Sequence, residues 1–190
     1  MDAGLSEQTD RIESYLEQAL FYSRSAEVEK DYLIKPVILQ KVIEDSLLQK
    51  KRELLEKHAS VDLHDLEKTV YSDGKWMEFI ISQILDNSIK YSGEQNTSLE
   101  IYGSDETEKV LLMIKDHGVG VSGEEVSRVF DKGFTGTNGR KYKKSTGIGL
   151  YLCKKLCKRL GHEILFSSVP GEGSTVTIVF PKSGFTDEVR

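Results

Sequence analysis

Apolar residues recur along this chain with two spacings, one typical of helices and one typical of strands. Recurrence every three or four positions predicts amphipathic helices at residues 5–28, 37–58, 73–91 and 147–160. Short β-prone runs predict strands at residues 60–66, 68–71, 98–102, 109–115, 162–168 and 174–180. Residues 30–36 form a hinge or a short edge strand, and Pro36 is expected to start the second helix.

The third predicted helix combines a strong start signal with an unusual polar stripe. Asp73 is a good N-cap residue directly before an apolar run. Gln83, Asn87 and Lys90 follow at spacings of four and three, which puts them on one face of an otherwise apolar helix. A polar stripe on a buried helix needs hydrogen-bond partners. It indicates either an internal network with neighbouring backbone or a cavity that holds a polar ligand and a metal.

A carboxylate and two glycines follow the predicted strand at residues 109–115. Asp116 can accept a hydrogen bond from an exocyclic amine such as that of adenine. Gly118 and Gly120 allow a sharp turn and the close approach of a flat ligand. A strand that ends in Asp and Gly is also an ordinary turn, so this stretch alone leaves both interpretations open.

A glycine-rich segment precedes the last predicted helix. Residues 133–149 contain five glycines with Ser, Thr and basic residues between them, which predicts a mobile loop that closes over a ligand. Gly147 and Gly149 open the helix, where free N–H groups and the helix dipole favour a phosphate. Just upstream, Ser122 and Glu125 have the spacing of a capping box.

Charge and composition narrow the class of ligand. The chain has 190 residues, enough for one domain and a short appendage, and a formal net charge of −5. Residues 132–162 nevertheless carry nine basic residues and no Asp or Glu, which indicates a local anionic partner. Because the segment matches no nucleic-acid module, a polyphosphate is the better candidate. Cys153 and Cys157 have the spacing of packed helix residues, and neither a signal peptide nor a membrane-spanning run is visible.

Taken in order, five motifs give the chain a resemblance to the ATP-binding catalytic domain of sensor histidine kinases, within the gyrase, Hsp90, histidine kinase and MutL superfamily. They look like the N, G1, F, G2 and G3 boxes, at residues 83–91, 116–120, 130–134, 145–150 and 171–175. The resemblance covers residues 30–182. It implies a two-layer α/β sandwich of the Bergerat type, with a mixed, mostly antiparallel sheet backed by helices. The amino-acid sequence of residues 83–91 resembles that of the small kinases paired with peptide-antibiotic export systems.

The resemblance also implies roles for individual residues. Asn87 would bind Mg²⁺, with Lys90 beside the phosphates of ATP and Tyr91 along the nucleotide. Asp116 would accept from the adenine amine, with space cleared by Gly118 and Gly120. The segment between Phe134 and Thr146 would form a lid, to which Lys132, Lys141 and Lys144 add charge. The other positions expected to bind the nucleotide are Phe134, Thr146, Gly147, Ile148, Gly149, Leu150 and Thr175.

One position departs from the family pattern. Gln83 stands where kinases of this type usually have Asn and the hydrolases of the superfamily have a Glu base. A Gln side chain cannot take a proton from water. The sequence therefore favours phosphoryl transfer to an imidazole over hydrolysis, with Gln83 and Asn87 as the catalytic pair. A hydrolysing ATPase of the chaperone or topoisomerase kind and a non-catalytic nucleotide-binding module remain alternatives.

None of the four histidines has the setting of a phosphoacceptor. They are His58, His64, His117 and His162, in a helix end, a strand-like stretch, the G1 turn and a strand start. Residues 1–29 resemble instead the second helix of the dimerisation and phosphotransfer hairpin, followed by the catalytic domain at 30–182 and a tail at 183–190. We therefore expect a soluble, cytoplasmic fragment of a homodimeric membrane kinase, with a response regulator as partner and no role for nucleic acid.

Overall fold

A computed structural model of the chain describes residues 32–92, 97–141 and 146–183. The chain divides into two units, Met1–Tyr32 and Leu33–Arg190, and the second contains every described helix and strand. The predicted helix at residues 5–28 and nearly all of the predicted tail lie outside the described residues.

A five-stranded sheet forms one layer of the second unit. Its strands are β2 (Ser60–His64), β4 (Ser98–Asp105), β5 (Lys109–Asp116), β6 (Glu163–Val169) and β7 (Gly173–Pro181). They lie in the order β2-β4-β5-β7-β6, and only the β2–β4 pair is parallel. The predicted mixed, mostly antiparallel sheet is therefore confirmed.

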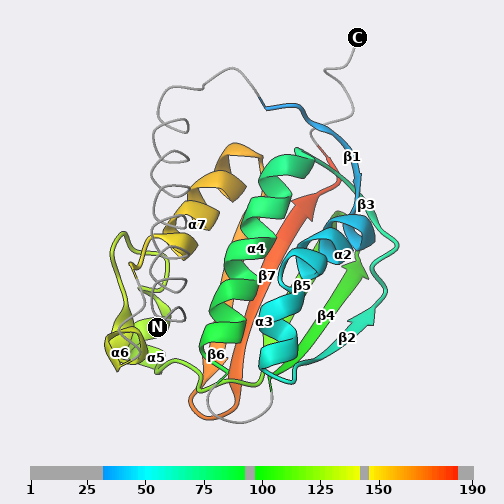
Figure 1. Ribbon diagram of the computed structural model, residues 1–190. Helices are drawn as coiled ribbons and strands as arrows, with labels where there is room; N and C mark the ends of the chain where they lie inside the picture. The colour runs from blue at the N-terminus through cyan, green and yellow to red at the C-terminus, as the bar shows by residue number, and fades with distance from the viewer. Residues whose placement is uncertain (1–31, 93–96, 142–145, 184–190) are drawn as a thin grey trace. The chain divides into compact units, whose positions relative to one another are not determined.

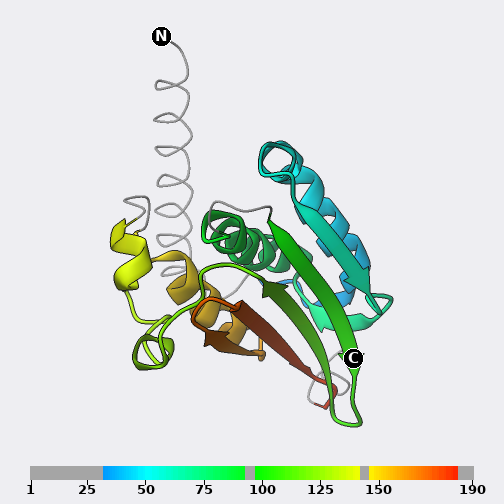
Figure 2. The same cartoon turned by 90° about the horizontal axis from the view of Figure 1, so that it is seen from below.

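Helices cover one face of this sheet (Figures 1 and 2). The helices of the unit are α2 (Leu39–Gln49), α3 (Lys51–Glu56), α4 (Gly74–Lys90), α5 (Gly123–Val126), α6 (Gly136–Lys141) and α7 (Gly149–Arg159). Alternate residues of β4 and β5 are buried, as expected for a sheet that packs on one side only. The core contains fully buried side chains from both layers, among them Ile43, Ile80, Ile81, Ile84, Leu99, Leu112, Leu152, Ile178 and Phe180.

The described helices include none that is both long enough and apolar enough to span a bilayer. The longest, α4, has 17 residues.

A small second sheet corrects the predicted start of the second helix. Residues Lys35–Ile38 form β1, which pairs antiparallel with β3 (Thr69–Ser72) and sets Pro36 opposite Tyr71. The helix α2 starts only at Leu39. A proline fits this two-stranded ribbon because its fixed φ suits extended backbone and an edge position needs no N–H. The edge-strand interpretation of this stretch is confirmed, whereas the prediction that Pro36 starts a helix was wrong.

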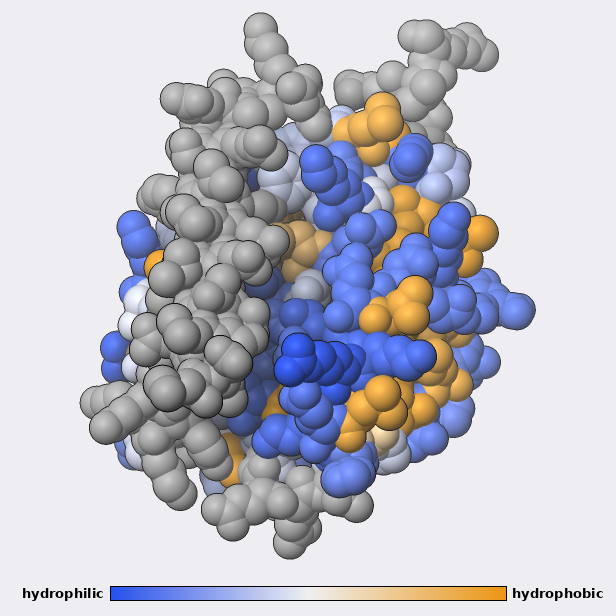
Figure 3. All heavy atoms as spheres, viewed as in Figure 1, coloured by the Kyte–Doolittle hydropathy of each residue, from blue (hydrophilic) through white to orange (hydrophobic). Residues whose placement is uncertain are grey.

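The second helix is also interrupted. Lys50 leaves helical geometry, with φ −94° and ψ 6°, and separates α2 from α3. No residue of α3 is buried, and Leu48 and Leu55 are 68% and 65% exposed. These leucines border a groove of about 470 Å³ between α2, α3 and β2, on the side of the molecule where hydrophobic side chains gather in Figure 3. The short helix α3 therefore leaves apolar surface of α2 and of its own exposed to solvent.

His162 begins the link into β6 and is buried, with 6% of its surface exposed. Its Nε2 lies 2.8 Å from the hydroxyl of Ser72, and its ring packs edge-on against Phe180. Burial lowers the pKa of this imidazole to about 4. A neutral, enclosed ring cannot reach an external γ-phosphate, which agrees with the expectation that His162 is not the acceptor.

Candidate functional site

The polar stripe of α4 lies where the sequence predicts it. Asp73 caps the helix by accepting hydrogen bonds from the backbone N–H groups of Lys75 and Trp76, at 3.0 and 3.3 Å. Gln83, Asn87 and Lys90 then fall among the half-buried positions of the helix. The Asn87 Nδ2 donates to the backbone oxygen of Gln83 at 3.0 Å. The amide nitrogen is thereby used within the helix, and the Oδ1 remains available as an acceptor.

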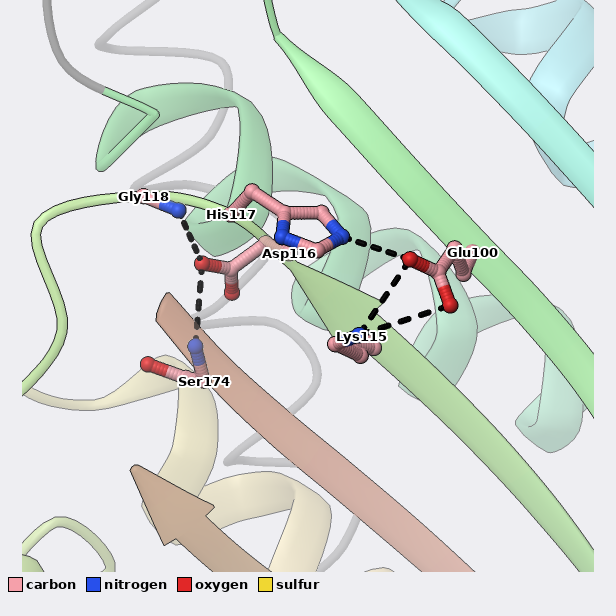
Figure 4. A network of polar contacts seen from close by, with 6 residues as sticks. All are labelled: Glu100, Lys115, Asp116, His117, Gly118 and Ser174. Atoms are coloured by element: carbon pink, nitrogen blue, oxygen red, sulfur yellow. Dashed lines mark hydrogen bonds and ion pairs between the residues drawn. The ribbon is translucent and has the colours of Figure 1, made fainter. Parts of the chain in front are cut away.

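Asp116 ends β5 with one carboxylate oxygen held by backbone (Figure 4). Its Oδ1 accepts from the N–H of Gly118 at 2.9 Å and from the N–H of Ser174 at 3.2 Å. Within the described parts of the chain, the other oxygen, Oδ2, has only a long 3.5 Å contact with the Ser88 hydroxyl. Burial raises the pKa of Asp116, and the two backbone N–H groups oppose that rise. The carboxylate is therefore fixed in orientation and keeps one oxygen for a ligand donor.

The two glycines after Asp116 have a structural reason that the sequence did not reveal. A Cβ on Gly118 would lie 2.3 Å from the backbone oxygen of Tyr91, and one on Gly120 would lie 2.1 Å from that of Val169. Val119 between them donates to Tyr91 at 3.0 Å. The turn is thus wedged between the end of α4 and the end of β6. Glycine is required at both positions because the backbone of Tyr91 and of Val169 comes too close for a Cβ, whether or not a ligand binds.

The start of β7 supplies a residue that the sequence analysis missed. Ser174 lies opposite Asp116 in the sheet, and Thr175 lies opposite Lys115. Since residues directly opposite each other share a face, the Thr175 side chain is on the other face of the sheet from Asp116. The N–H of Ser174 binds Asp116, and its hydroxyl lies 3.0 Å from that of Ser168. Only the strand register reveals that Ser174 is next to the carboxylate.

The first turn of α7 lies against the polar stripe of α4. A Cβ on Gly149 would be 2.8 Å from the Gln83 Oε1, so the Gln83 side chain reaches this helix start. Among the described residues, no side chain caps α7. Gly147 has φ +66°, and a Cβ there would lie 2.4 to 2.6 Å from backbone atoms of Gly133 and Phe134. The helix therefore begins with an open N-terminus next to the glycine-rich segment.

The glycine-rich segment contains one element that its composition did not predict. Residues Gly136–Lys141 form the short helix α6. Gly133 donates to the oxygen of Gly147 at 2.9 Å, so the two ends of the segment are joined. Residues 142–145, with Lys144, and the side chain of Lys141 lie outside the described residues. The prediction of a mobile loop did not include this helix.

The predicted capping box of α5 is also wrong. Ser122 is the N-cap residue, but no side chain forms a capping hydrogen bond there. The Glu125 carboxylate is engaged elsewhere, because its Oε1 accepts from the backbone N–H and the hydroxyl of Thr137 at 2.9 and 3.0 Å. A contact between residues 12 apart overrides the local motif.

Glu100, Lys115 and His117 form a charged cluster beside Asp116 (Figure 4). The Nε2 of His117 lies 2.6 Å from the Oε1 of Glu100, and the Nζ of Lys115 lies 3.2 Å from the same oxygen. Hydrogen bonds from His117 and then from Lys115 hold the pKa of Glu100 below its ordinary value. The cluster follows from the opposition of Glu100 and Lys115 in the β4–β5 pair, a register that the sequence does not specify.

Four contacts bring the five sequence motifs together. The N box meets G2 through Gln83 and Gly149, and it meets G1 through Tyr91 and Val119. G1 meets G3 through the bond from Ser174 to Asp116. The F box meets G2 through Gly133 and Gly147. The motifs are spread over about half of the chain and converge on one region at the end of α4.

Comparisons with known proteins agree with this geometry. Two sensor kinases of Bacillus subtilis (strain 168) are similar over 93% of the chain: the sensor histidine kinase YxdK, at 34% identity over 54% of its length, and the sensor protein BceS, at 36% over 52%. The chain thus spans about half the length of these relatives. Among solved structures, histidine kinase ThkA in complex with response regulator protein TrrA matches 94% of the chain and 49% of ThkA, with a TM-score of 0.73 and 18% identity, which shows a shared fold.

The family model that matches the chain covers residues 72–184 and is described as histidine kinase-, DNA gyrase B- and HSP90-like ATPase. It contains all five motifs, and it spans more than half of the sequence. The chain belongs to the histidine kinase-, DNA gyrase B- and HSP90-like ATPase family.

Proposed function

We propose that this chain is the ATP-binding catalytic domain of a two-component sensor histidine kinase. It transfers the γ-phosphoryl group of Mg-ATP to a histidine, from which the group passes to a response regulator. The observation that carries the proposal is that the four contacts between motifs bring the polar stripe of α4, on which Asn87 lies, together with Asp116 and the start of α7. An amide oxygen suits the metal ion, a carboxylate suits the adenine amine, and a helix N-terminus suits the phosphates of a metal-bound nucleotide.

Asp116 recognises the base. Its Oδ1 is occupied by Gly118 and Ser174, which leaves Oδ2 to accept a hydrogen bond from the adenine amine. An acceptor held rigidly by backbone donors loses little freedom when the ligand binds. Tyr91 is the C-cap residue of α4, and its backbone oxygen accepts from Val119 in this turn. We assign Tyr91 to the nucleotide site, together with Thr146, Ile148 and Leu150.

The phosphates bind at the start of α7. The helix has 11 residues, and the described residues give it no side-chain cap. The Thr146 hydroxyl accepts from the N–H of the N-cap residue Ile148 at 3.3 Å, and the positive dipole end and the N–H groups of the first turn are available to an anion. Gly149 has no side chain to keep a phosphate away from the backbone. We assign Lys90, on the same stripe of α4, to the phosphates as a source of positive charge.

The donor set fits Mg²⁺ bound together with ATP. Among the described residues no cluster of three His, Cys, Asp or Glu side chains could hold a metal ion. Asn87 offers one hard amide oxygen, and Mg²⁺ commonly keeps several waters and binds through few protein ligands plus phosphate oxygens. Asn87 Oδ1 would therefore hold the ion, which neutralises the phosphate charge during transfer.

Gln83 favours transfer over hydrolysis. Its side chain reaches the start of α7, where the phosphates are expected, yet an amide cannot act as a base for water. It can orient an attacking imidazole or a bridging water by hydrogen bonding. A hydrolysing ATPase of the superfamily is the second candidate, and sustained phosphate release well above background would favour it.

Partners follow from the proposed role. YxdK and BceS are named sensor proteins, and ThkA was solved with its response regulator. By analogy, a response regulator is the expected downstream partner. We further propose that the full-length protein is a membrane-bound homodimer joined through the phosphotransfer hairpin, of the peptide-antibiotic-sensing type.

Phosphoryl transfer in trans tests the proposed activity. We expect the chain, given γ-labelled ATP and Mg²⁺, to label a separate histidine-bearing dimerisation hairpin, slowly because the two are not tethered. The label should be labile in acid and stable in alkali. The expected level of label on the chain itself is background. Acid-labile label mapped to His58, His64, His117 or His162 would contradict the view that none of them is the acceptor.

The Asp116→Asn variant should bind ATP and adenosine about tenfold more weakly or worse, by similar factors. The substitution retains one acceptor oxygen and turns the ligand-facing position into a donor that opposes the adenine amine. Titration calorimetry with both ligands measures the effect. Asp105→Asn is a matched control, because Asp105 pairs with Lys182 at the other end of the sheet. A loss confined to ATP would assign Asp116 to the phosphates or the metal and not to the base.

A further inference from the structure

Ser168 lies outside the five motifs, yet its hydroxyl joins the residue that follows G1 to two residues of G3. It donates to the backbone oxygen of Gly173 at 2.7 Å. It accepts from the backbone N–H of Val121 at 2.8 Å, and it lies 3.0 Å from the hydroxyl of Ser174. A hydroxyl has one proton and two lone pairs, so donation to Gly173 leaves it to accept from both Val121 and Ser174. These three bonds use the full hydrogen-bonding capacity of the Ser168 side chain.

The strand register explains why Ser168 reaches this position. Ser168 lies opposite Ser174 in the β6–β7 pair, and Ser174 lies opposite Asp116 in the β5–β7 pair. Because residues directly opposite each other share a face, the three residues form one row across the ends of adjacent strands. Ser174 is the middle member of this row, and Figure 4 shows its backbone nitrogen directed at Asp116.

A single peptide group connects Ser168 to Asp116. The oxygen of Gly173 and the N–H of Ser174 belong to the same planar trans peptide group, in which C=O and N–H point in opposite directions. Ser168 holds the oxygen from the β6 side, and the N–H donates to the Asp116 Oδ1 at 3.2 Å on the β5 side. Gly173 has φ +114°, and a glycine restricts the rotation of such a peptide group less than other residues do. The Ser168 hydroxyl therefore supplies a constraint that the glycine backbone lacks.

The same hydroxyl also fixes the end of the turn that follows Asp116. The Val121 N–H donates to Ser168, and two residues earlier the backbone oxygen of Val119 accepts from the N–H of Gly171 at 2.9 Å. The turn is thus bonded to the β6–β7 hairpin at two points. Ser168 provides one of these bonds and also holds the peptide group that orients the carboxylate.

We propose that Ser168 is a positioning residue for base recognition, which orients Asp116 toward the adenine amine through the peptide group between Gly173 and Ser174. The inference rests on the proposed function, because that function assigns Asp116 to the base. Without the hydroxyl, the Val121 N–H and the Gly173 oxygen lose a partner, and the peptide group can rotate. Asp116 would then lose the donor on its β7 side. A less fixed carboxylate loses more freedom when it binds the amine, so the amine should be bound more weakly.

Two nucleosides isolate the contact with the amine. Purine riboside has a hydrogen atom where adenosine has its exocyclic amine, so the ratio of their affinities measures the bond to Asp116. We expect the wild-type protein to prefer adenosine about tenfold, and Ser168→Ala to reduce that preference about fivefold. The affinity for purine riboside should remain nearly unchanged. Competition of each nucleoside against labelled Mg-ATP measures both affinities.

Ser167→Ala is the matched control, since Ser167 is an exposed neighbour that lies opposite Thr175, on the face of the sheet away from Asp116. It should leave the adenosine preference unchanged. Ser168→Thr and Ser168→Val form a second pair, because the two side chains have nearly the same shape and only threonine has a hydroxyl. Threonine should keep most of the preference and valine should lose it, even if Ser168→Ala does not fold. In a double-mutant cycle, Ser168→Ala and Asp116→Asn should not be additive.

Equal losses of adenosine and purine riboside affinity in Ser168→Ala would overturn the inference, because they would indicate general damage to the turn. An unchanged preference for adenosine in Ser168→Ala would overturn it as well. So would equal preferences in Ser168→Thr and Ser168→Val. A wild-type protein that binds Mg-ATP without preferring adenosine to purine riboside would contradict the assignment of Asp116 to the amine, and this inference with it. Absence of Mg-ATP binding by the wild-type protein would refute the proposed function itself.

Discussion

Replacing Gly173 by alanine is expected to lower the free energy of unfolding by about 3–5 kcal/mol. Gly173 has φ +114°, a backbone region that L side chains rarely adopt. A Cβ there would also lie 1.9 Å from the backbone oxygen of Asp116. Both strands would have to move apart at the position where Ser174 binds Asp116. Denaturant unfolding should give the loss of stability, and nucleotide affinity should fall with it.

Gly171, two residues earlier in the same turn, is a matched control. It also has a positive φ, of 80°, but a Cβ there would have no atom within 4 Å. Gly171→Ala should therefore show only the conformational penalty, about 1–2 kcal/mol. If the two variants were equally destabilised, the contact between Gly173 and Asp116 would not be the reason for the glycine.

The second large effect is expected for Asn87→Ala, which should weaken Mg-ATP binding about a hundredfold, or roughly 2–3 kcal/mol. Adenosine affinity should remain close to that of the wild-type protein. Asn87 contributes one intrahelical hydrogen bond, to Gln83, and alanine is a good helix former, so the fold should persist. Calorimetry with ATP in the presence and absence of Mg²⁺, and with adenosine, separates the metal from the base.

Asp86→Asn is the control for Asn87→Ala. Asp86 is the adjacent residue of α4 but pairs with Lys50 at 2.5 Å, on the side of α2. Removing that partly exposed ion pair should change stability little and leave Mg²⁺ dependence unchanged. Equal losses of adenosine and Mg-ATP affinity in Asn87→Ala would contradict the assignment of Asn87 to the metal.

The residues that the sequence located well are those whose signals are local. The Asp73 cap, the stripe of α4 and the strand that ends in Asp116 all depend on neighbours within one or two turns or on alternation. The family resemblance added the order of the motifs, and the contacts between motifs were consistent with it. Family membership could therefore be predicted from the sequence.

The errors share a different cause, which is pairing between distant residues. Pro36 lies in a strand because Tyr71 lies opposite it. The Glu125 side chain does not form the capping box of α5 because it accepts two hydrogen bonds from Thr137. The sequence analysis also missed Ser174, which lies opposite Asp116 because of the β5–β7 register; a slip by one residue would turn every side chain of the strand to the other face. The Glu100–His117 contact depends on register in the same way. No periodicity within one segment contains this information.

The hydrogen bond between Gly133 and Gly147 has a consequence for sequence change in the segment between them. Because Gly133 and Gly147 are joined by this hydrogen bond, the residues between them form a loop whose two ends lie side by side. Lengthening such a loop raises the entropic cost of closing it only slightly. It should move neither the start of α7 nor the turn at Asp116. This part of the protein can therefore accept insertions, deletions or a grafted recognition peptide at sites where the rest of the nucleotide cradle could not.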